Sequence, residues 1–250
     1  RILTYRTLSL LADLSEPFSA RRARKFRRSA EKRAPHNFRN TREVAGVVAA
    51  AHPGRPASDP QRARRILVSD CRLPRPDVSA GERATVGLLT DLAALGYEVV
   101  FVPIDMCEDI TYRTLLEKLG VTVVTKANGY NSAAAFVQTE GHKFGAFYLI
   151  RVDVAEALLP SARAAAPDAR ILFHAPDLYF LRETRAAELN ADAEEMAAAE
   201  ETRRRETAIM RASDHVVLVS PAEWNYVEKI LPRDRVTIFP ALYSPVAADP

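Results

Sequence analysis

The sequence predicts an α/β fold for residues 65–245: a doubly wound, mainly parallel sheet of about seven strands. Two observations predict it. Short apolar, largely β-branched runs recur along this part of the chain, and helical patterns separate them. Since parallel strands need crossover connections, which are usually helices, this alternation indicates a parallel sheet. The apolar share of 48% suffices for a buried core.

Each predicted strand is a run of three or four largely apolar residues between polar or turn-forming residues, as in sheets that are covered on both faces. In chain order the runs are Ile66–Val68, Val99–Val102, Val121–Val124, Phe147–Ile150, Ile171–Phe173, Val216–Val219 and Val236–Phe239.

The predicted helices carry apolar residues at helical spacing. They are Gly81–Leu95, Thr111–Leu119, Asn131–Glu140, Val154–Ala166, Leu178–Leu189, Asp192–Ala212 and Ala222–Leu231. Gly96 and Gly120 directly follow the first two, as the glycine after a helix does. Together the elements predict a Rossmann-like fold, preceded by a basic helical leader.

Charge separates the leader from the predicted sheet. Residues 1–64 hold 15 Lys and Arg against 5 Asp and Glu, whereas residues 65–250 hold 20 against 27. We therefore expect a leader and linker over 1–64, a basic helix within it at 19–33, the α/β domain over 65–245, and the start of an interdomain linker at 246–250. The basic charge belongs to the leader and not to the domain, so nucleic acid is not an expected partner.

Two interpretations of the basic helix stay open: a solvated helix between domains, or peripheral contact with anionic lipid headgroups, for which Phe26 is its one bulky apolar anchor. The chain begins with Arg1 and has no signal-peptide pattern, so we expect it to be part of a longer protein. Two cysteines without a CxxC pair indicate neither a disulfide scaffold nor a zinc ribbon, and fit a cytoplasmic location. No metal site is predicted.

Ligands of such sheets bind beyond the carboxyl ends of the strands, which directs attention to the loops there. The first loop, residues 69–83, is long and contains Asp77, Ser79, Gly81 and Arg83. Ser79 is expected to cap the next helix, whose free amides can face an anion. Arg83 either reaches into the crevice beyond these strand ends, where it would contact a ligand, or is a solvated helix residue. The loop lacks both GxGxxG and GxxxxGK[ST], which disfavours a nicotinamide enzyme and a P-loop NTPase.

Arg151 directly follows the fourth strand. Since an unpaired charge beside a buried strand is costly, we expect Arg151 either to bind an anionic ligand or to form an ion pair with Asp153 or Asp177. His174 ends the fifth strand, and Asp177 and Tyr179 follow it. A histidine or carboxylate at this edge can orient a hydroxyl or accept its proton. The alternatives are a helix cap for Asp177 and a hydrogen-bonded core imidazole for His174.

Several segments, in this order and spacing, resemble the N-terminal domain of bacterial glycosyltransferases of the family-four GT-B type. They are ILVSDCRLPRPDVSAGERA (66–84), GYEVVFVP (96–103), LGVTVV (119–124), ARILFHAPDLYFLRE (169–183), ASDHVVLVSPAE (212–223) and RVTIFPALYSP (235–245). The resemblance implies two Rossmann-like domains around a cleft. The first would receive the acceptor, and the second, which would follow the linker, would bind the nucleotide sugar.

The resemblance also implies roles for the candidate residues. Asp77, Ser79, Gly81 and Arg83 would lie in the first cleft loop. Arg151, His174 and Asp177 would line the acceptor side with Tyr179. Arg83 and Arg151 would assist the diphosphate, and Asp177 or His174 would position the acceptor hydroxyl.

The expected activity is sugar transfer to a cell-surface glycan or related acceptor, with retention at the anomeric carbon and without a metal or other cofactor. This chain alone is expected to be inactive. Two alternatives remain: a non-catalytic binding or docking module of a multidomain polysaccharide-assembly protein, and another Rossmann-type enzyme such as a methyltransferase. The second would need a glycine-rich first loop, and this loop has a single glycine.

Overall fold

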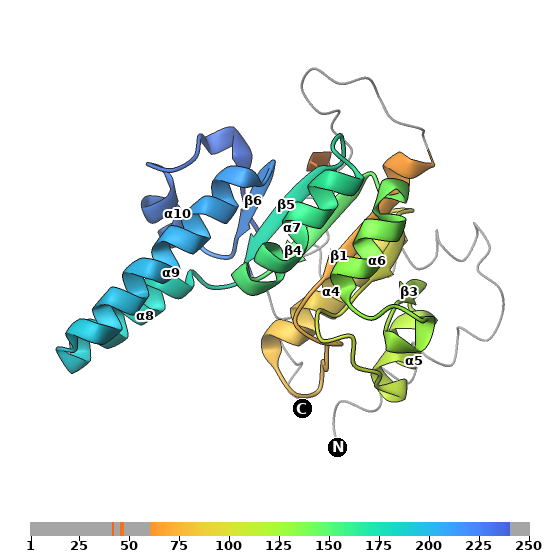
Figure 1. Ribbon diagram of the computed structural model, residues 1–250, viewed down its shortest axis with the longest axis horizontal. Helices are drawn as coiled ribbons and strands as arrows, with labels where there is room; N and C mark the ends of the chain where they lie inside the picture. The colour runs from red at the N-terminus through yellow and green to blue at the C-terminus, as the bar shows by residue number, and fades with distance from the viewer. Residues whose placement is uncertain (1–41, 43–45, 48–60, 241–250) are drawn as a thin grey trace, which may run out of the picture.

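A computed structural model describes residues 42, 46–47 and 61–240. Within them lies one sheet of seven strands, all parallel, in the order β3-β2-β1-β4-β5-β6-β7 (Figure 1). The strands are β1 (Arg65–Ser69), β2 (Glu98–Phe101), β3 (Val121–Val123), β4 (Ala146–Ile150), β5 (Arg170–Ala175), β6 (His215–Leu218) and β7 (Val236–Ile238). The predicted Rossmann-like, doubly wound fold is confirmed.

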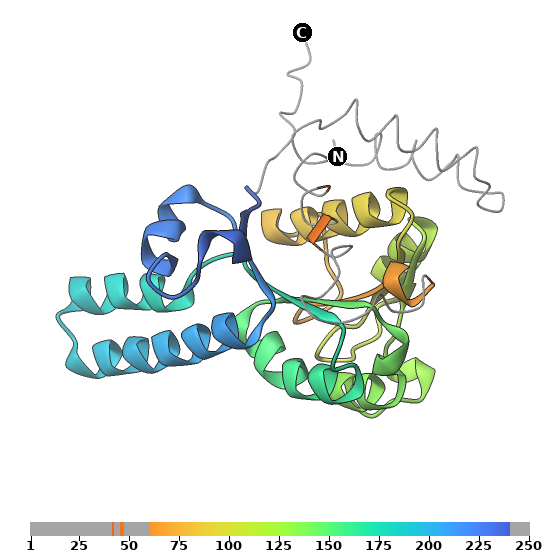
Figure 2. The same cartoon turned by 90° about the horizontal axis from the view of Figure 1, so that it is seen from above.

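Helices cover both faces of the sheet, as Figure 2 shows with α4 on one side and α6 and α7 on the other. The α-helices are α4 (Ala80–Ala94), α5 (Ile110–Lys118), α6 (Ala133–Glu140), α7 (Val152–Ala165), α8 (Tyr179–Asn190), α9 (Ala193–Ala212) and α10 (Pro221–Val227). Short 3-10 turns lie at Arg62–Arg64, Lys126–Asn128, Gly141–Lys143 and Arg233–Arg235.

The strand residues divide by alternation between two hydrophobic cores. Phe147 and Leu149 of β4 face the core under α6, α7, α9 and α10, whereas Tyr148 and Ile150 face the core under α4 and α5. Val47, which precedes the predicted domain boundary, packs against the second core. All four strand residues are at most 1% exposed, so both faces of the sheet are covered at β4.

The direction of winding reverses beside β1. This strand lies between β2 and β4, and its register with β4 pairs Ser69 with Leu149. The connections that leave β1 and β4 lead to α4 on one face and α7 on the other. The carboxyl ends of β1 and β4 are therefore the topological switch point, the place where open α/β sheets bind ligands.

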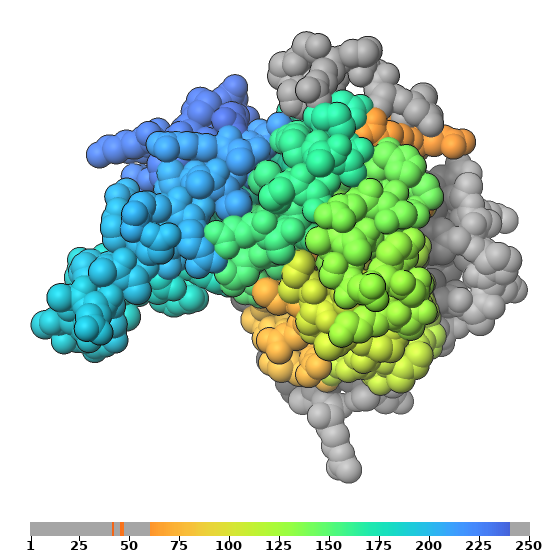
Figure 3. Space-filling model, in the orientation of Figure 1, coloured from red at the N-terminus to blue at the C-terminus, as the bar shows by residue number. Residues whose placement is uncertain are grey.

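Helices α8 and α9 form an antiparallel hairpin that projects from the body of the domain (Figures 1 and 3). A turn at Ala191 joins them, in which that residue takes a left-handed conformation with φ of 51°. The base of the hairpin lies beside the carboxyl end of β5, and α9 continues from there towards β6. The projection therefore begins next to the predicted site residues.

The predicted helix Ala222–Leu231 is shorter in the structure. Helix α10 ends at Val227, although the amides of Ile230 and Leu231 still donate to the carbonyl oxygen of Val227. Pro232 explains this end, because a proline has no N–H to donate to the carbonyl oxygen four residues earlier, that of Glu228, and its ring would clash with that carbonyl in a continued helix.

Some predictions fall on other parts of the chain. The basic helix at 19–33 and the linker at 246–250 lie outside the described residues. In the part of the chain that the structure describes, no helix has both the length and the apolar character needed to cross a bilayer.

Candidate functional site

An ion pair joins the ends of the two central strands. Asp70 follows β1 and Arg151 follows β4, and Nε of Arg151 lies 2.8 Å from Oδ1 of Asp70. The Asp70 side chain is 5% exposed and that of Arg151 is 29% exposed, so the guanidinium reaches from a buried carboxylate towards solvent. The same oxygen of Asp70 accepts the amide of Cys71.

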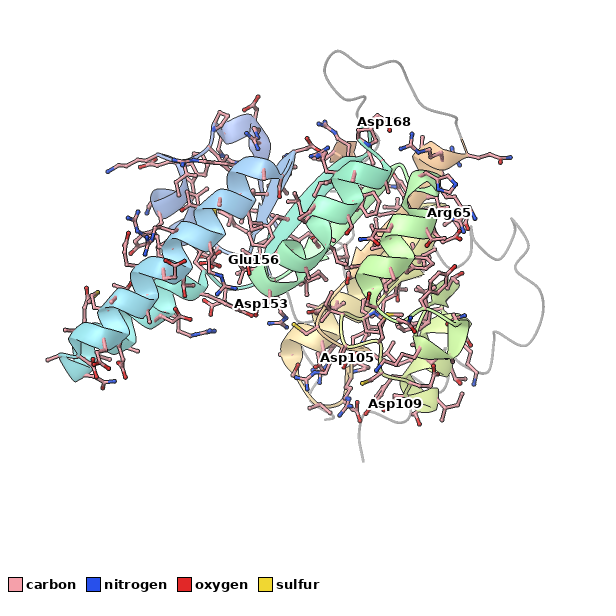
Figure 4. All side chains as sticks on the ribbon, viewed as in Figure 1. Arg65, Asp105, Asp109, Asp153, Glu156 and Asp168 are labelled. Atoms are coloured by element: carbon pink, nitrogen blue, oxygen red, sulfur yellow. The ribbon has the colours of Figure 1, made fainter. Side chains whose placement is uncertain are left out.

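The two partners predicted for Arg151 are therefore wrong. Asp153 and Glu156 of α7 lie on the side of that helix that faces α9 (Figure 4), and both bind Arg205. Asp177 instead binds Arg182. Arg151 pairs with Asp70 because β1 and β4 are neighbours in the sheet.

The backbone of Arg151 is strained. Its φ of 79° and ψ of 152° lie in a region that is essentially restricted to glycine and costs about 1–3 kcal/mol. The Arg151 amide donates to the carbonyl oxygen of His174 at 2.9 Å, which ties the end of β4 to β5. The fold thus holds an arginine in an unfavourable conformation at the edge where a ligand is expected.

Three further side chains continue from Arg151 along this edge. Nη1 of Arg151 lies 3.4 Å from the Tyr179 hydroxyl, and the Arg182 guanidinium stacks over the Tyr179 ring at 4.6 Å. Arg182 in turn donates to Asp177 at 2.5 Å. We call Asp70, Arg151, Tyr179, Arg182 and Asp177 the Arg151 cluster. Arg151, Tyr179 and Asp177 were predicted as site residues, and the structure brings them together and adds Asp70 and Arg182.

Asp177 does not cap α8, contrary to one of its predicted roles. The capping carboxylate is Glu206 of α9, which accepts the amides of Tyr179 at 3.2 Å and Phe180 at 3.0 Å. Glu206 is 1% exposed, and burial raises its pKa to about 7, although the two amide hydrogen bonds oppose this shift. The nearby Asp177 contributes to the rise. The hairpin thus fixes the helix that carries Tyr179.

His174 has a partner from the neighbouring strand. The Tyr148 hydroxyl lies 3.1 Å from Nδ1 of His174, and the two rings meet edge to face. Burial, helped by the positive charge of Arg151, lowers the pKa of His174 to about 3. At neutral pH the imidazole is therefore uncharged.

The four predicted residues of the first loop have local partners. Ser79 caps α4 as predicted, since its side chain accepts the amide of Glu82 at 3.2 Å. Arg83 donates to the carbonyl oxygen of Pro76 at 3.0 Å, and Asp77 accepts from the Tyr112 hydroxyl at 3.1 Å. Gly81 lies in the first turn of α4.

All four residues are exposed. The hydrogen bonds of Ser79, Arg83 and Asp77 go to α4, to the loop itself and to α5, and none of them reaches the Arg151 cluster. The residue that anchors this loop, Glu82, was not among the predicted site residues. Glu82 is 6% exposed and accepts from Arg72 Nε and from the Arg75 amide, both at 3.0 Å.

Two other ionisable side chains, His215 and Cys71, are uncharged at neutral pH. His215, which opens β6, contacts the Thr237 hydroxyl at 2.9 Å across to β7, and burial lowers its pKa to about 4. Burial and the charge of Asp70 raise the pKa of Cys71, so its thiol is protonated at neutral pH. Within the described ranges, His, Cys, Asp and Glu form no group of three or more that could hold a metal ion.

Comparison with known protein families finds no match, and comparison with curated proteins finds none. The chemistry of the site therefore rests on its geometry. Arg151, Tyr179 and the imidazole of His174 place a cation, a phenol and an uncharged ring at one edge of the sheet. These groups suit a ligand rich in oxygen, such as a carbohydrate or a phosphate ester.

Proposed function

We propose that this domain is the acceptor-side half of a GT-B-type glycosyltransferase, which moves a sugar from a nucleotide-sugar donor to a cell-surface glycan or related acceptor. The observation that carries the proposal is the strained Arg151 at the carboxyl edge of β1 and β4, held by Asp70 and Tyr179. Such strain clusters where a side chain must be aimed at a ligand. The resemblance of the six sequence segments supports the same class.

The proposed chemistry divides the work between two domains. Departure of a nucleoside diphosphate needs positive charge or amide dipoles near its phosphates. Arg151 would supply part of that charge, with Arg83 from the first loop. A second domain would make most donor contacts, as the resemblance implies. Asp177 would orient the acceptor hydroxyl, and transfer would retain the configuration at the anomeric carbon.

The proposed setting is the cytoplasm, with the leader at the inner face of the membrane. The support is its excess of basic residues, 15 against 5, because a polybasic segment is attracted to anionic lipid.

The test is transfer of labelled sugar by a protein in which this domain is joined to the proposed donor-binding domain, using a panel of nucleotide sugars. We expect Asp177→Ala to lower kcat/KM by about 100-fold or more, as loss of a group that orients or deprotonates a hydroxyl does. Asp234→Ala is the matched control, since Asp234 is an exposed aspartate beside β7 at the opposite edge. Turnover unchanged by Asp177→Ala removes Asp177 from the mechanism. Absence of transfer from every donor favours the docking-module alternative.

A further inference from the structure

The hydroxyl of Tyr148 and the imidazole of His174 form an isolated pair beneath the carboxyl edge of the sheet. Tyr148 is fully buried on β4, and His174 is near the end of β5, where it pairs with Ile150. The two side chains are thus diagonal neighbours on one face, 3.1 Å apart at hydroxyl and Nδ1. The face is the one covered by α4, whose core also contains Phe239 beside the imidazole.

This contact selects one tautomer of His174. A neutral imidazole has one protonated nitrogen, and a tyrosine hydroxyl has one proton to donate. If Nδ1 carried the proton, the Tyr148 hydroxyl would accept that bond, and two buried groups would lack a partner: the hydroxyl proton and the lone pair on Nε2. With the proton on Nε2, only the Nε2–H group lacks one. Such an unmade bond costs about 1–3 kcal/mol. The hydroxyl therefore donates to Nδ1, and the proton of the imidazole is on Nε2.

Within the described residues, the Nε2–H group has no hydrogen-bond acceptor. The residue as a whole is partly exposed, but its Nε2 atom is buried and has no hydrogen-bond partner there. Nearly all buried polar groups in folded proteins are satisfied, so an orphan of this kind needs an explanation. A ligand that brings an acceptor oxygen to the end of β5 supplies one.

We propose that His174 is a hydrogen-bond donor to an oxygen of the bound ligand, through Nε2, and that Tyr148 is the positioning residue that holds it in this tautomer. The ligand class is a carbohydrate or its phosphate ester, and the oxygen that accepts the hydrogen bond is a hydroxyl or a phosphate oxygen. The identity of the ligand rests on the proposed function, whereas the tautomer does not. In this role His174 selects and orients an oxygen, and it does not remove a proton.

The first test is the tautomer in the 250-residue chain, read at pH 7 by NMR of ¹⁵N-labelled histidine. We expect His174 to be neutral with the proton on Nε2. In Tyr148→Phe the Nδ1 resonance should shift, and a population protonated on Nδ1 should appear. Tyr130→Phe is the control, because it also deletes one hydroxyl, which bonds to Glu140 away from the site. A proton on Nδ1, or an imidazolium, in the unmodified chain overturns the proposal. An Nδ1 resonance indifferent to Tyr148→Phe overturns the positioning role.

The second test adds two probes: a methyl glucopyranoside, which has only hydroxyl and ether oxygens, and inorganic pyrophosphate, which has only phosphate oxygens. We expect one of them to shift the Nε2 proton resonance of His174, and the one that does so identifies the kind of oxygen. His174→Gln keeps an N–H donor and should retain binding, whereas His174→Leu should weaken it by about tenfold, the loss of one hydrogen bond.

Other outcomes separate the two proposals. If neither probe moves the His174 resonance, or if His174→Leu binds as well as the unmodified chain, the ligand assignment is overturned. Sugar transfer by this domain joined to the proposed donor-binding domain would then still support the proposed function. If transfer is absent but a probe binds at His174, the donor role stands and the proposed function fails.

Discussion

Arg151 and Asp70 connect the ends of β4 and β1 through an ion pair of 2.8 Å at the point where the sheet reverses its winding. The aspartate is nearly buried, and the arginine extends from it towards solvent. The cation is therefore fixed in place, with one side paired and the other available to the Tyr179 hydroxyl.

Replacing Asp70 should destabilise the domain through Arg151. In Asp70→Asn the amide oxygen can still accept the Cys71 amide, but the guanidinium loses its charge partner. We expect a loss of about 2–3 kcal/mol in the free energy of unfolding, less than for a fully buried pair because Arg151 keeps some contact with solvent. Urea denaturation measures it. The control is Glu200→Gln, in an exposed pair with Arg203, which should cost at most about 1 kcal/mol. Equal costs for the two variants would contradict the structural role of the ion pair.

The strain at Arg151 can be measured by comparing two substitutions that both delete the side chain. Arg151→Gly accepts a φ of 79° without penalty, and Arg151→Ala does not. The strain of about 1–3 kcal/mol is partly offset by the greater freedom of glycine in the unfolded chain. We expect the glycine variant to be more stable by about 1 kcal/mol. An alanine variant of equal or greater stability would show that this backbone is relaxed.

Glu206 should make stability depend on pH. Its native pKa of about 7 exceeds the value of about 4.3 in an unfolded chain, so the native state binds more protons between these limits. The stability due to its protonation is complete below about pH 4 and is lost as the pH rises towards 7.

The comparison with Glu206→Gln isolates this group, because Glu223, His174 and His215 titrate in both proteins. The free energy of unfolding of the unmodified chain, minus that of the variant, should fall between pH 5 and 7 by at most about 1.4 kcal/mol per unit. Denaturant titrations at several pH values measure it. A difference that stays flat or rises with pH contradicts the raised pKa.

The first loop should loosen when Glu82 is replaced. In Glu82→Ala the Arg75 amide and the Arg72 side chain lose their common acceptor. We expect faster amide hydrogen exchange across residues 71–79 and a loss of about 1–3 kcal/mol in stability. Arg83→Ala removes only an exposed hydrogen bond to Pro76 and should leave exchange in the loop nearly unchanged. If both variants exchange alike, Glu82 does not anchor the loop.

The fold was largely predictable because its signals are local. Runs such as Phe147–Ile150 indicate buried strands, and Gly96 and Gly120 take the positive φ values that end helices. The end of α10 was placed too late, since apolar spacing continues to Leu231 and only Pro232 opposes it.

The site was less predictable because its contacts depend on strand order and register. Asp70 is one aspartate after a strand, and only the adjacency of β1 and β4 pairs it with Arg151. Glu206 is far along the chain from the helix it caps, and the hairpin brings it back. Tyr148 counts as an apolar strand residue until the register of β4 with β5 places its hydroxyl beside His174. No local pattern contains these three relationships.

The most direct test of the central claim is a crystal structure of this domain, joined to the proposed donor-binding domain, with a nucleotide sugar and a glycan acceptor. The account predicts ligand oxygens within hydrogen-bond distance of Arg151 and of Nε2 of His174, at the carboxyl ends of β4 and β5. Ligand bound elsewhere on the domain, with the Arg151 cluster unchanged and unoccupied, would contradict it.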